Sequence, residues 1–124
     1  MVLVGLVGLC VLLFLVVLMG RWSLRRSSVE IAQGLKELTP LGTSYERAAA
    51  VLERRYSKTK KNEKTGFLLQ EMTHQETVGV KSIEVHLGQY FQLPLGRTSV
   101  DAFWGFDTNG KLIKVWVWKI TDSL

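Results

Sequence analysis

The first twenty residues constrain this chain more than any other stretch, because no side chain from Val2 to Met19 is charged or strongly polar. The hydrocarbon core of a bilayer is about 30 Å thick and is crossed by about 20 helical residues, within a range of roughly 17–25. A backbone in hydrocarbon must satisfy its own hydrogen bonds, so the segment should be helical despite its valines. We therefore expect residues 1–20 to be a transmembrane anchor in contact with membrane lipid.

A cleaved signal peptide is the alternative interpretation of this run, and three features oppose it. No basic residue precedes the run, the run is longer than the usual apolar core of about 7–15 residues, and Leu18 stands where a cleavage site needs a small residue. Cys10 follows Leu9 in the middle of the run, which does not fit a lipoprotein signal. The sequence favours an uncleaved anchor.

The residues after the run suit a membrane surface. Trp22 is an aromatic ring of the kind that prefers the interface, and Arg21, Arg25 and Arg26 end the apolar segment. Residues 21–28 are expected to form a basic linker beside the membrane. Because Lys and Arg are retained on the cytoplasmic side, these arginines favour a single-pass protein of the plasma or inner membrane with a cytoplasmic domain.

Residues 29–124 are numerous enough for one domain with its own apolar core. The single cysteine lies in the apolar run, so no disulfide is expected in this domain. The net charge is +5, and eleven Lys or Arg face five Glu between Arg21 and Lys64. This excess suits solubility and topology, or attraction to anionic lipid headgroups. No motif indicates a nucleic-acid partner.

The domain should begin with a short amphipathic helix. Ser27 and Ser28 are good caps, and apolar residues recur at helical spacing over 29–38. The residue before Pro40 avoids helical geometry, so this helix should end there.

A second helix is expected over 44–56, opened by a capping box in which Thr43 accepts from a backbone amide and Glu46 reaches back. The two helices then make a helical hairpin. Residues 57–66 contain no large apolar side chain, which predicts an exposed, mobile loop.

Strands are expected in the remainder, over 67–75, 81–87 with a continuation or bulge to 93, 98–107 and 111–121. Asn109-Gly110 is the preferred pair for a two-residue hairpin turn. The predicted fold is α+β, with an N-terminal transmembrane helix and a helical hairpin packed on one face of an antiparallel sheet of three to four strands.

Two registers of the last hairpin are compatible with its turn. With a two-residue turn, Trp104 faces Val115 and Phe106 faces Ile113, which leaves one face wholly apolar. With a three-residue turn and a bulge, Trp104 lies beside Lys114 and charge enters both faces. We prefer the first register. The expected sheet core is then Ile83, Val85, Leu87, Ile113, Val115 and Val117.

The opposite sheet face is expected to be open and to bind a partner. The residues expected there are Asp101, Phe103, Lys114, Trp116 and Trp118. Exposed aromatic patches often mark interfaces, and Trp is enriched where binding energy is concentrated. The alternative is that this face is covered by residues 57–66, by Tyr90-Phe91 or by the flank of the anchor.

No residue pattern predicts catalysis. His74 and His86 lack metal-ligand spacing, and no nucleophile, phosphate-binding or dinucleotide motif is present. We expect a non-enzymatic protein without cofactor, metal or small-molecule substrate. The leading hypothesis is that another membrane or envelope protein binds the aromatic face. The alternative is that the basic helices and loop engage anionic lipid.

Several short motifs stand out in the domain: Leu41-Gly42-Thr43-Ser44, Val51-Leu52, Gly88-Gln89-Tyr90 and Phe106-Asp107-Thr108-Asn109-Gly110-Lys111-Leu112. With the order of helices and strands, they resemble the small α+β modules of the β-lactamase-inhibitor-protein-like and SmpA/OmlA-like groups. Over residues 29–124 the chain looks most like an uncharacterised bacterial membrane family of this fold. The resemblance implies a non-enzymatic binding or assembly module, often extracytoplasmic, which opposes the orientation that the arginines favour.

Overall fold

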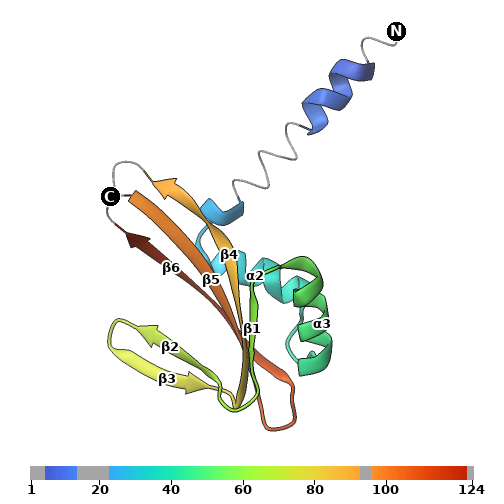
Figure 1. Ribbon diagram of the computed structural model, residues 1–124. Coiled ribbons are helices and arrows are strands. Elements are labelled where there is room, and N and C mark those ends of the chain that lie inside the picture. The colour runs from blue at the N-terminus through green and yellow to red at the C-terminus, as the bar shows by residue number, and fades with distance from the viewer. Residues whose placement is uncertain (1–4, 14–22, 93–95, 123–124) are drawn as a thin grey trace.

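The computed structural model describes residues 5–13, 23–92 and 96–122. Residues 5–13, which belong to the predicted anchor, form a helix with exposed side chains (Figure 1). Within the described ranges, no helix combines the length and the apolar character needed to cross a membrane. The other residues of the predicted anchor, together with Arg21 and Trp22, lie outside the described residues.

The domain starts with three helical elements: η1 (Ser23–Arg25), α2 (Ser28–Leu38) and α3 (Tyr45–Arg55). Both predicted helices are therefore present. The Ser27 hydroxyl accepts a hydrogen bond from the Glu30 amide at 3.2 Å, which caps α2 as its sequence indicated.

The cap of α3 lies one residue later than predicted. Ser44 is the N-cap, and its hydroxyl accepts from the Arg47 amide at 3.3 Å. Thr43 instead donates its hydroxyl to the Pro40 carbonyl at 2.6 Å, and its own carbonyl accepts from the Leu112 amide at 2.9 Å. The predicted capping box is wrong because Thr43 belongs to the turn that joins the helices to the sheet.

Six strands occur in the described residues: β1 (Thr59–Asn62), β2 (Phe67–Glu71), β3 (His74–Val78), β4 (Lys81–Gln92), β5 (Gly96–Phe106) and β6 (Leu112–Asp122). Four of them form an antiparallel sheet in the order β1-β4-β5-β6, and β2 and β3 pair as a separate hairpin. The helices cover one face of the main sheet, and the β2–β3 hairpin lies on the other side (Figure 1). The expected α+β class, with an antiparallel sheet of four strands, is confirmed.

Two sequence predictions about the early strands are wrong. The expected mobile loop contains β1, in which Thr59 pairs with Val85 and Asn62 pairs with Ser82. Backbone pairing to an edge needs no apolar side chain, and lysines are common on edge strands, so the composition concealed this strand. The single strand expected over 67–75 is instead the first arm and the turn of the β2–β3 hairpin.

The turn between β5 and β6 has three residues, which is the alternative that we did not prefer. Gly110 adopts a φ of +73°, a conformation that favours glycine. The Asp107 amide donates to the Lys111 carbonyl at 2.9 Å. The Asp107 carboxylate accepts from the amides of Asn109 and Lys111, each at 2.9 Å. The Asp107 carboxylate thus stabilises a three-residue turn. Asn109-Gly110 lies within this turn and does not form a two-residue loop.

The strands beyond this turn nevertheless take the preferred register. Phe106 pairs with Leu112, and a register shift follows immediately. Ile113 is the extra residue of this bulge, after which Trp104 faces Val115 as predicted. The bulge restores the pattern that buries one face, because a one-residue slip would have turned every later side chain over.

The main core lies between the helices and the sheet. Its predicted members Ile83, Val85, Val115 and Val117 are buried, and Leu87 is partly buried. Ile113 is 45% exposed, so its assignment to the core is wrong. The bulge turns Ile113 outward, and Leu112 is buried at the neighbouring position.

Trp104 anchors this core from the centre of β5. Its side chain is completely buried, and Nε1 donates to the Thr39 hydroxyl at 3.0 Å. The Thr39 hydroxyl donates in turn to the Leu35 carbonyl at 3.0 Å. The polar atom of the largest buried side chain is therefore satisfied at the end of α2, which ties the first helix to the sheet.

Candidate binding cleft between the sheet and the hairpin

The face opposite the helices carries the residues that the sequence predicted for it. Cross-strand pairing of β4, β5 and β6 arranges two adjacent rows on this face, Glu84–Phe103–Trp116 and His86–Asp101–Trp118. Lys114 is next along the same face, opposite Gly105. The five predicted residues thus share one surface, and each of them is half-buried.

The β2–β3 hairpin covers part of this face, so the expectation of an open surface is wrong for Phe103 and Trp116. The Phe67 ring stacks on Trp116 with centroids 6.0 Å apart and an interplanar angle of 8°. Phe67 also lies 5.6 Å from the Phe103 ring. With Leu69 and Val78, it forms a second small core. The sequence suggested residues 57–66, Tyr90-Phe91 or the flank of the anchor as a cover for this face, and the β2–β3 hairpin is none of these.

Glycine at position 105 permits this close approach. A Cβ atom there would lie 2.8 Å from Val78 Cγ1 and 3.0 Å from Phe67 Cε1. Either distance is shorter than ordinary van der Waals contact. The hairpin backbone and side chains therefore occupy the space that a side chain on β5 would need.

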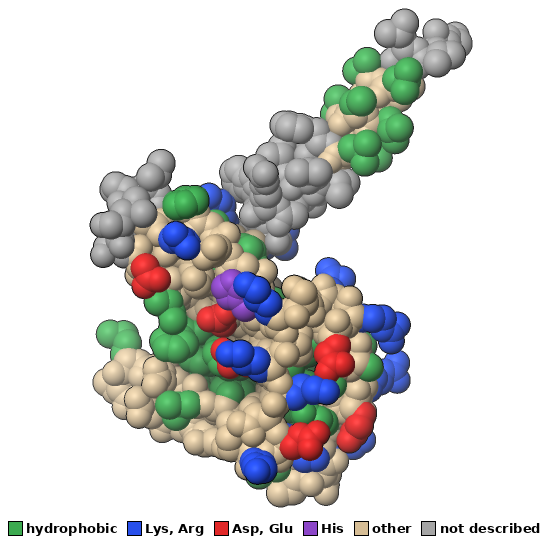
Figure 2. All heavy atoms as spheres, viewed as in Figure 1, with side chains coloured by type: hydrophobic (Ala, Val, Ile, Leu, Met, Phe, Trp, Pro, Cys, Tyr) green, Lys and Arg blue, Asp and Glu red, His purple; other side chains and the backbone are tan. Residues whose placement is uncertain are grey.

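Trp118 marks the edge of the covered region. Its ring stacks on Trp116 with centroids 5.5 Å apart and an interplanar angle of 21°. Trp118 and Phe103 also border a cleft of about 460 Å³ between the main sheet and the hairpin. Figure 2 shows hydrophobic side chains gathered in a hollow between these two parts. The other residues of the cleft are Lys60, Lys61, Asn62, Gly66, Phe67, Leu68, Gln70, Ser82 and Glu84.

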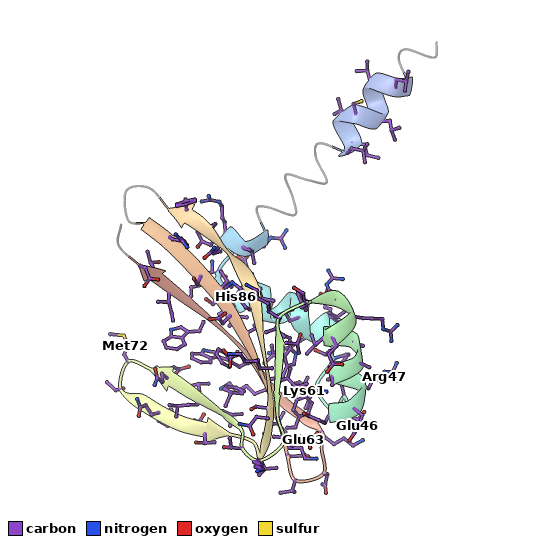
Figure 3. All side chains as sticks on the ribbon, viewed as in Figure 1. Glu46, Arg47, Lys61, Glu63, Met72 and His86 are labelled. Carbon is purple, nitrogen blue, oxygen red and sulfur yellow. The ribbon has the colours of Figure 1, made fainter. Side chains whose placement is uncertain are left out.

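A polar pair borders the cleft on the same face. The His86 Nδ1 atom lies 2.8 Å from Asp101 Oδ1, and both side chains are partly exposed. His86, which is labelled in Figure 3, and Asp101 line a second hollow of about 490 Å³. This hollow shares Lys60 and Glu84 with the cleft. The sequence alone does not reveal this pair, because 15 residues separate His86 from Asp101 and only the β4–β5 register joins them.

A surface ion pair lies where β1 meets α3. The Lys61 Nζ atom is 2.7 Å from Glu53 Oε1. The hydrogen bond to Glu53 and its negative charge raise the pKa of Lys61 above its ordinary value. Lys61 therefore stays protonated, and Glu53 balances its positive charge. Figure 3 shows Lys61 on β1 between the sheet and α3.

The β2–β3 hairpin presents apolar side chains to solvent both at its tip and on β2. Met72 lies at this tip and is fully exposed (Figure 3), and Leu68 is exposed on β2.

In the part of the chain that the structure describes, no group of three or more His, Cys, Asp and Glu side chains is arranged to hold a metal ion. The cleft combines an aromatic floor with a mixed-charge rim, a composition suited to holding an apolar side chain and its polar backbone.

Two residues of the predicted membrane interface belong to the structured domain. An Nη2 hydrogen of Arg25 is donated to the Phe91 carbonyl at 2.9 Å. The Arg26 carbonyl accepts a hydrogen bond from Lys119 Nζ. Arg25 and Arg26 therefore both form hydrogen bonds with the end of the main sheet toward which β4 and β6 run.

No protein-family model, curated protein or solved structure matches this chain. The resemblance to the β-lactamase-inhibitor-protein-like and SmpA/OmlA-like groups stays a prediction from short motifs. The function proposed below accordingly rests on the geometry and chemistry of the cleft.

Proposed function

We propose that this chain is a non-enzymatic binding module, held at a membrane by its N-terminal apolar run, and that a segment of a partner protein occupies the cleft beside Trp118. The position of Trp118 carries the proposal. One ring face stacks on Trp116, while the side chain also borders a cleft of about 460 Å³. A preorganised indole at the mouth of a cleft is a typical centre of binding energy, because it offers a large area without losing much side-chain freedom.

The rim of the cleft supports a peptide-like ligand. Lys60 and Glu84 face each other across β1 and β4, and the His86–Asp101 pair follows one row further along. Opposite charges side by side can contact both the carbonyl and the amide groups of an extended chain. An apolar side chain of that segment would lie on Trp118.

Trp118 and Trp116 have different roles in this proposal, although the sequence predicted both for one binding surface. Trp116 is packed under Phe67 in the second core, so its loss should detach the hairpin. Trp118 lies outside that core group. Trp118→Ser should therefore abolish binding while the domain stays folded, whereas Trp116→Ser should disturb the hairpin.

Site-specific photo-crosslinking in native membranes tests the proposal. A photoreactive residue replaces Ile120, which is exposed two residues beyond Trp118, and the matched control replaces exposed Ile113 near the β5–β6 turn. We expect a discrete crosslinked protein from position 120 only, with at least a tenfold loss of yield in Trp118→Ser. Lys60→Glu, a charge reversal on the exposed rim, should lower the yield without touching either core.

Two outcomes contradict the proposal. Equal crosslinking yield in the parent, Trp118→Ser and Lys60→Glu would show that the cleft is not the binding surface. A loss of free energy of unfolding in Trp118→Ser as large as in Trp116→Ser, measured by urea denaturation, would show that Trp118 is a core residue. The Lys60→Glu yield then decides whether the cleft binds at all.

A further inference from the structure

A second surface lies at the end of the main sheet that meets η1. The Arg25 guanidinium lies 4.7 Å from the centroid of the Tyr90 ring, in addition to its hydrogen bond to the Phe91 carbonyl. Figure 1 shows η1 beside this end of β4. Ser23 is also the first described residue of the domain, and only Arg21 and Trp22 separate it in the sequence from the first twenty residues. This end of the sheet is therefore the part of the domain tethered to the predicted anchor.

Further cations gather around the two aromatic rings. Lys119 Nζ lies 5.3 Å from the Tyr90 ring centroid and 3.3 Å from the Tyr90 hydroxyl. The Arg97 guanidinium lies 5.9 Å from the Phe91 ring centroid. The Phe91 side chain is 59% exposed. The exposed Phe91 thus has the Arg97 guanidinium on its ring and the Arg25 guanidinium on its backbone carbonyl.

The charge of this end is strongly unbalanced. Over residues 23–26, 88–92, 96–100 and 119–122, Arg25, Arg26, Arg97 and Lys119 are basic and only Asp122 is acidic. We name these four basic residues, with Tyr90 and Phe91, the basic-aromatic end. We infer that the basic-aromatic end docks on an anionic bilayer, with Phe91 at the boundary between headgroups and acyl chains and with Arg25, Arg97 and Lys119 against lipid phosphates.

The physical argument has two parts. Aromatic side chains prefer the membrane interface, and basic side chains close to an anionic surface are attracted to it. This attraction is screened within about 8 Å at physiological ionic strength, so the groups must be held at the surface. The inference rests on the proposed N-terminal anchor, because the tether at Ser23 supplies that proximity.

This surface differs from the one that the sequence suggested for lipid. That alternative used the basic helices and the lysine-rich segment 57–66. In the structure, Lys61 of that segment is paired with Glu53. The side chains of Arg25, Arg97 and Lys119 instead contact rings and backbone carbonyls, neither of which carries a negative charge. Their charge is available to phosphate.

Single-cysteine labelling of the full chain tests the inference. In a Cys10→Ser background, which removes the only cysteine, Phe91→Cys and Ile113→Cys are each labelled with a nitrobenzoxadiazole fluorophore. The protein is reconstituted in vesicles of phosphatidylcholine with or without phosphatidylglycerol. Ile113 is the matched control, since it is 45% exposed and follows the β5–β6 turn. We expect a blue-shifted emission at position 91, with severalfold stronger quenching by lipid-attached quenchers, in anionic vesicles only.

Charge variants show whether phosphate is the ligand. Arg97→Gln combined with Lys119→Gln should remove most of the quenching at position 91, and the charge-preserving Arg97→Lys should retain it. Molar salt should act like the Gln pair. Equal water exposure at positions 91 and 113 in anionic vesicles would overturn the inference. Equal burial of position 91 in neutral vesicles, or in the Gln pair, would overturn the role of the cations.

The same samples separate this inference from the proposed function. Release of the chain by alkaline carbonate would contradict the anchor, whatever the fluorophore reports. Retention of the chain with a water-exposed position 91 would contradict the docking surface alone. The comparison of Trp118→Ser with the parent at position 120 reports on the cleft, because Trp118 borders the cleft and lies outside the basic-aromatic end.

Discussion

Tyr45 buries its hydroxyl in the main core without a hydrogen-bond partner among the described residues. Its ring meets Phe106 edge-on, with centroids 5.1 Å apart, so the side chain is held by its aromatic contacts. A buried hydroxyl that makes no hydrogen bond loses its hydration without compensation. We expect Tyr45→Phe to raise the free energy of unfolding by about 1 kcal/mol, measured by urea denaturation of the detergent-solubilised chain.

The same substitution has a defined pH dependence. Burial, followed by the negative charge of Glu63, raises the pKa of Tyr45 above its ordinary value of 10.0. The folded state therefore holds this proton more tightly than the unfolded state. The contribution of Tyr45 to stability is fully present below pH 10.0. It is lost as the pH rises through the pKa that Tyr45 has in the folded state. The advantage of Tyr45→Phe should consequently grow above that pH, and a constant advantage would contradict burial of a neutral hydroxyl.

At the scale of the element, the bulge in β6 decides which of two neighbouring apolar residues is buried. Leu112 is buried and Ile113 is 45% exposed. We expect Leu112→Ala to lower the free energy of unfolding by about 2–5 kcal/mol, as for other large core residues. Ile113→Ser should change it by less than about 0.5–1 kcal/mol, as for most surface positions. Chemical denaturation of the two variants measures these changes. A larger loss of stability in Ile113→Ser than in Leu112→Ala would contradict the bulge.

The β2–β3 hairpin is the element that sequence reasoning handled least well. Its burial pattern depends on Phe67 reaching Phe103 and Trp116 from a different sheet. Gly105 is the one local signal, since a glycine inside an otherwise apolar strand often marks a close approach of another segment. Gly105 does not indicate which segment approaches. The main sheet was easier, because Ile83 and Val85 alternate cleanly with polar residues along one strand.

At the scale of the whole molecule, the side of the membrane on which the domain lies is open to a direct test. Arg21, Arg25 and Arg26 follow the apolar run, and no Lys or Arg precedes it. We expect a C-terminal fluorescent-protein fusion to be active and a C-terminal alkaline phosphatase fusion to be inactive in a bacterial host, because basic residues are retained in the cytoplasm. Lysines inserted after Met1 should weaken this preference. The opposite reporter pattern would agree with the family resemblance.

The amino-acid sequence by itself determined the local features of this protein. The serine cap and the periodicity predicted α2, the periodicity predicted α3, and strict alternation predicted the buried face of β4. The pattern of β5 and β6 also placed Trp104 opposite Val115, because burying one face admits only one register along most of the hairpin.

Only the tertiary structure decided the features that depend on contacts between distant segments. It turned Ile113 outward, paired β1 with β4, joined His86 to Asp101 and laid the hairpin over Phe103 and Trp116. The physical reason is that burial of apolar area, backbone pairing and side-chain hydrogen bonding are satisfied over the whole fold, and no single stretch of sequence contains both partners of such a contact.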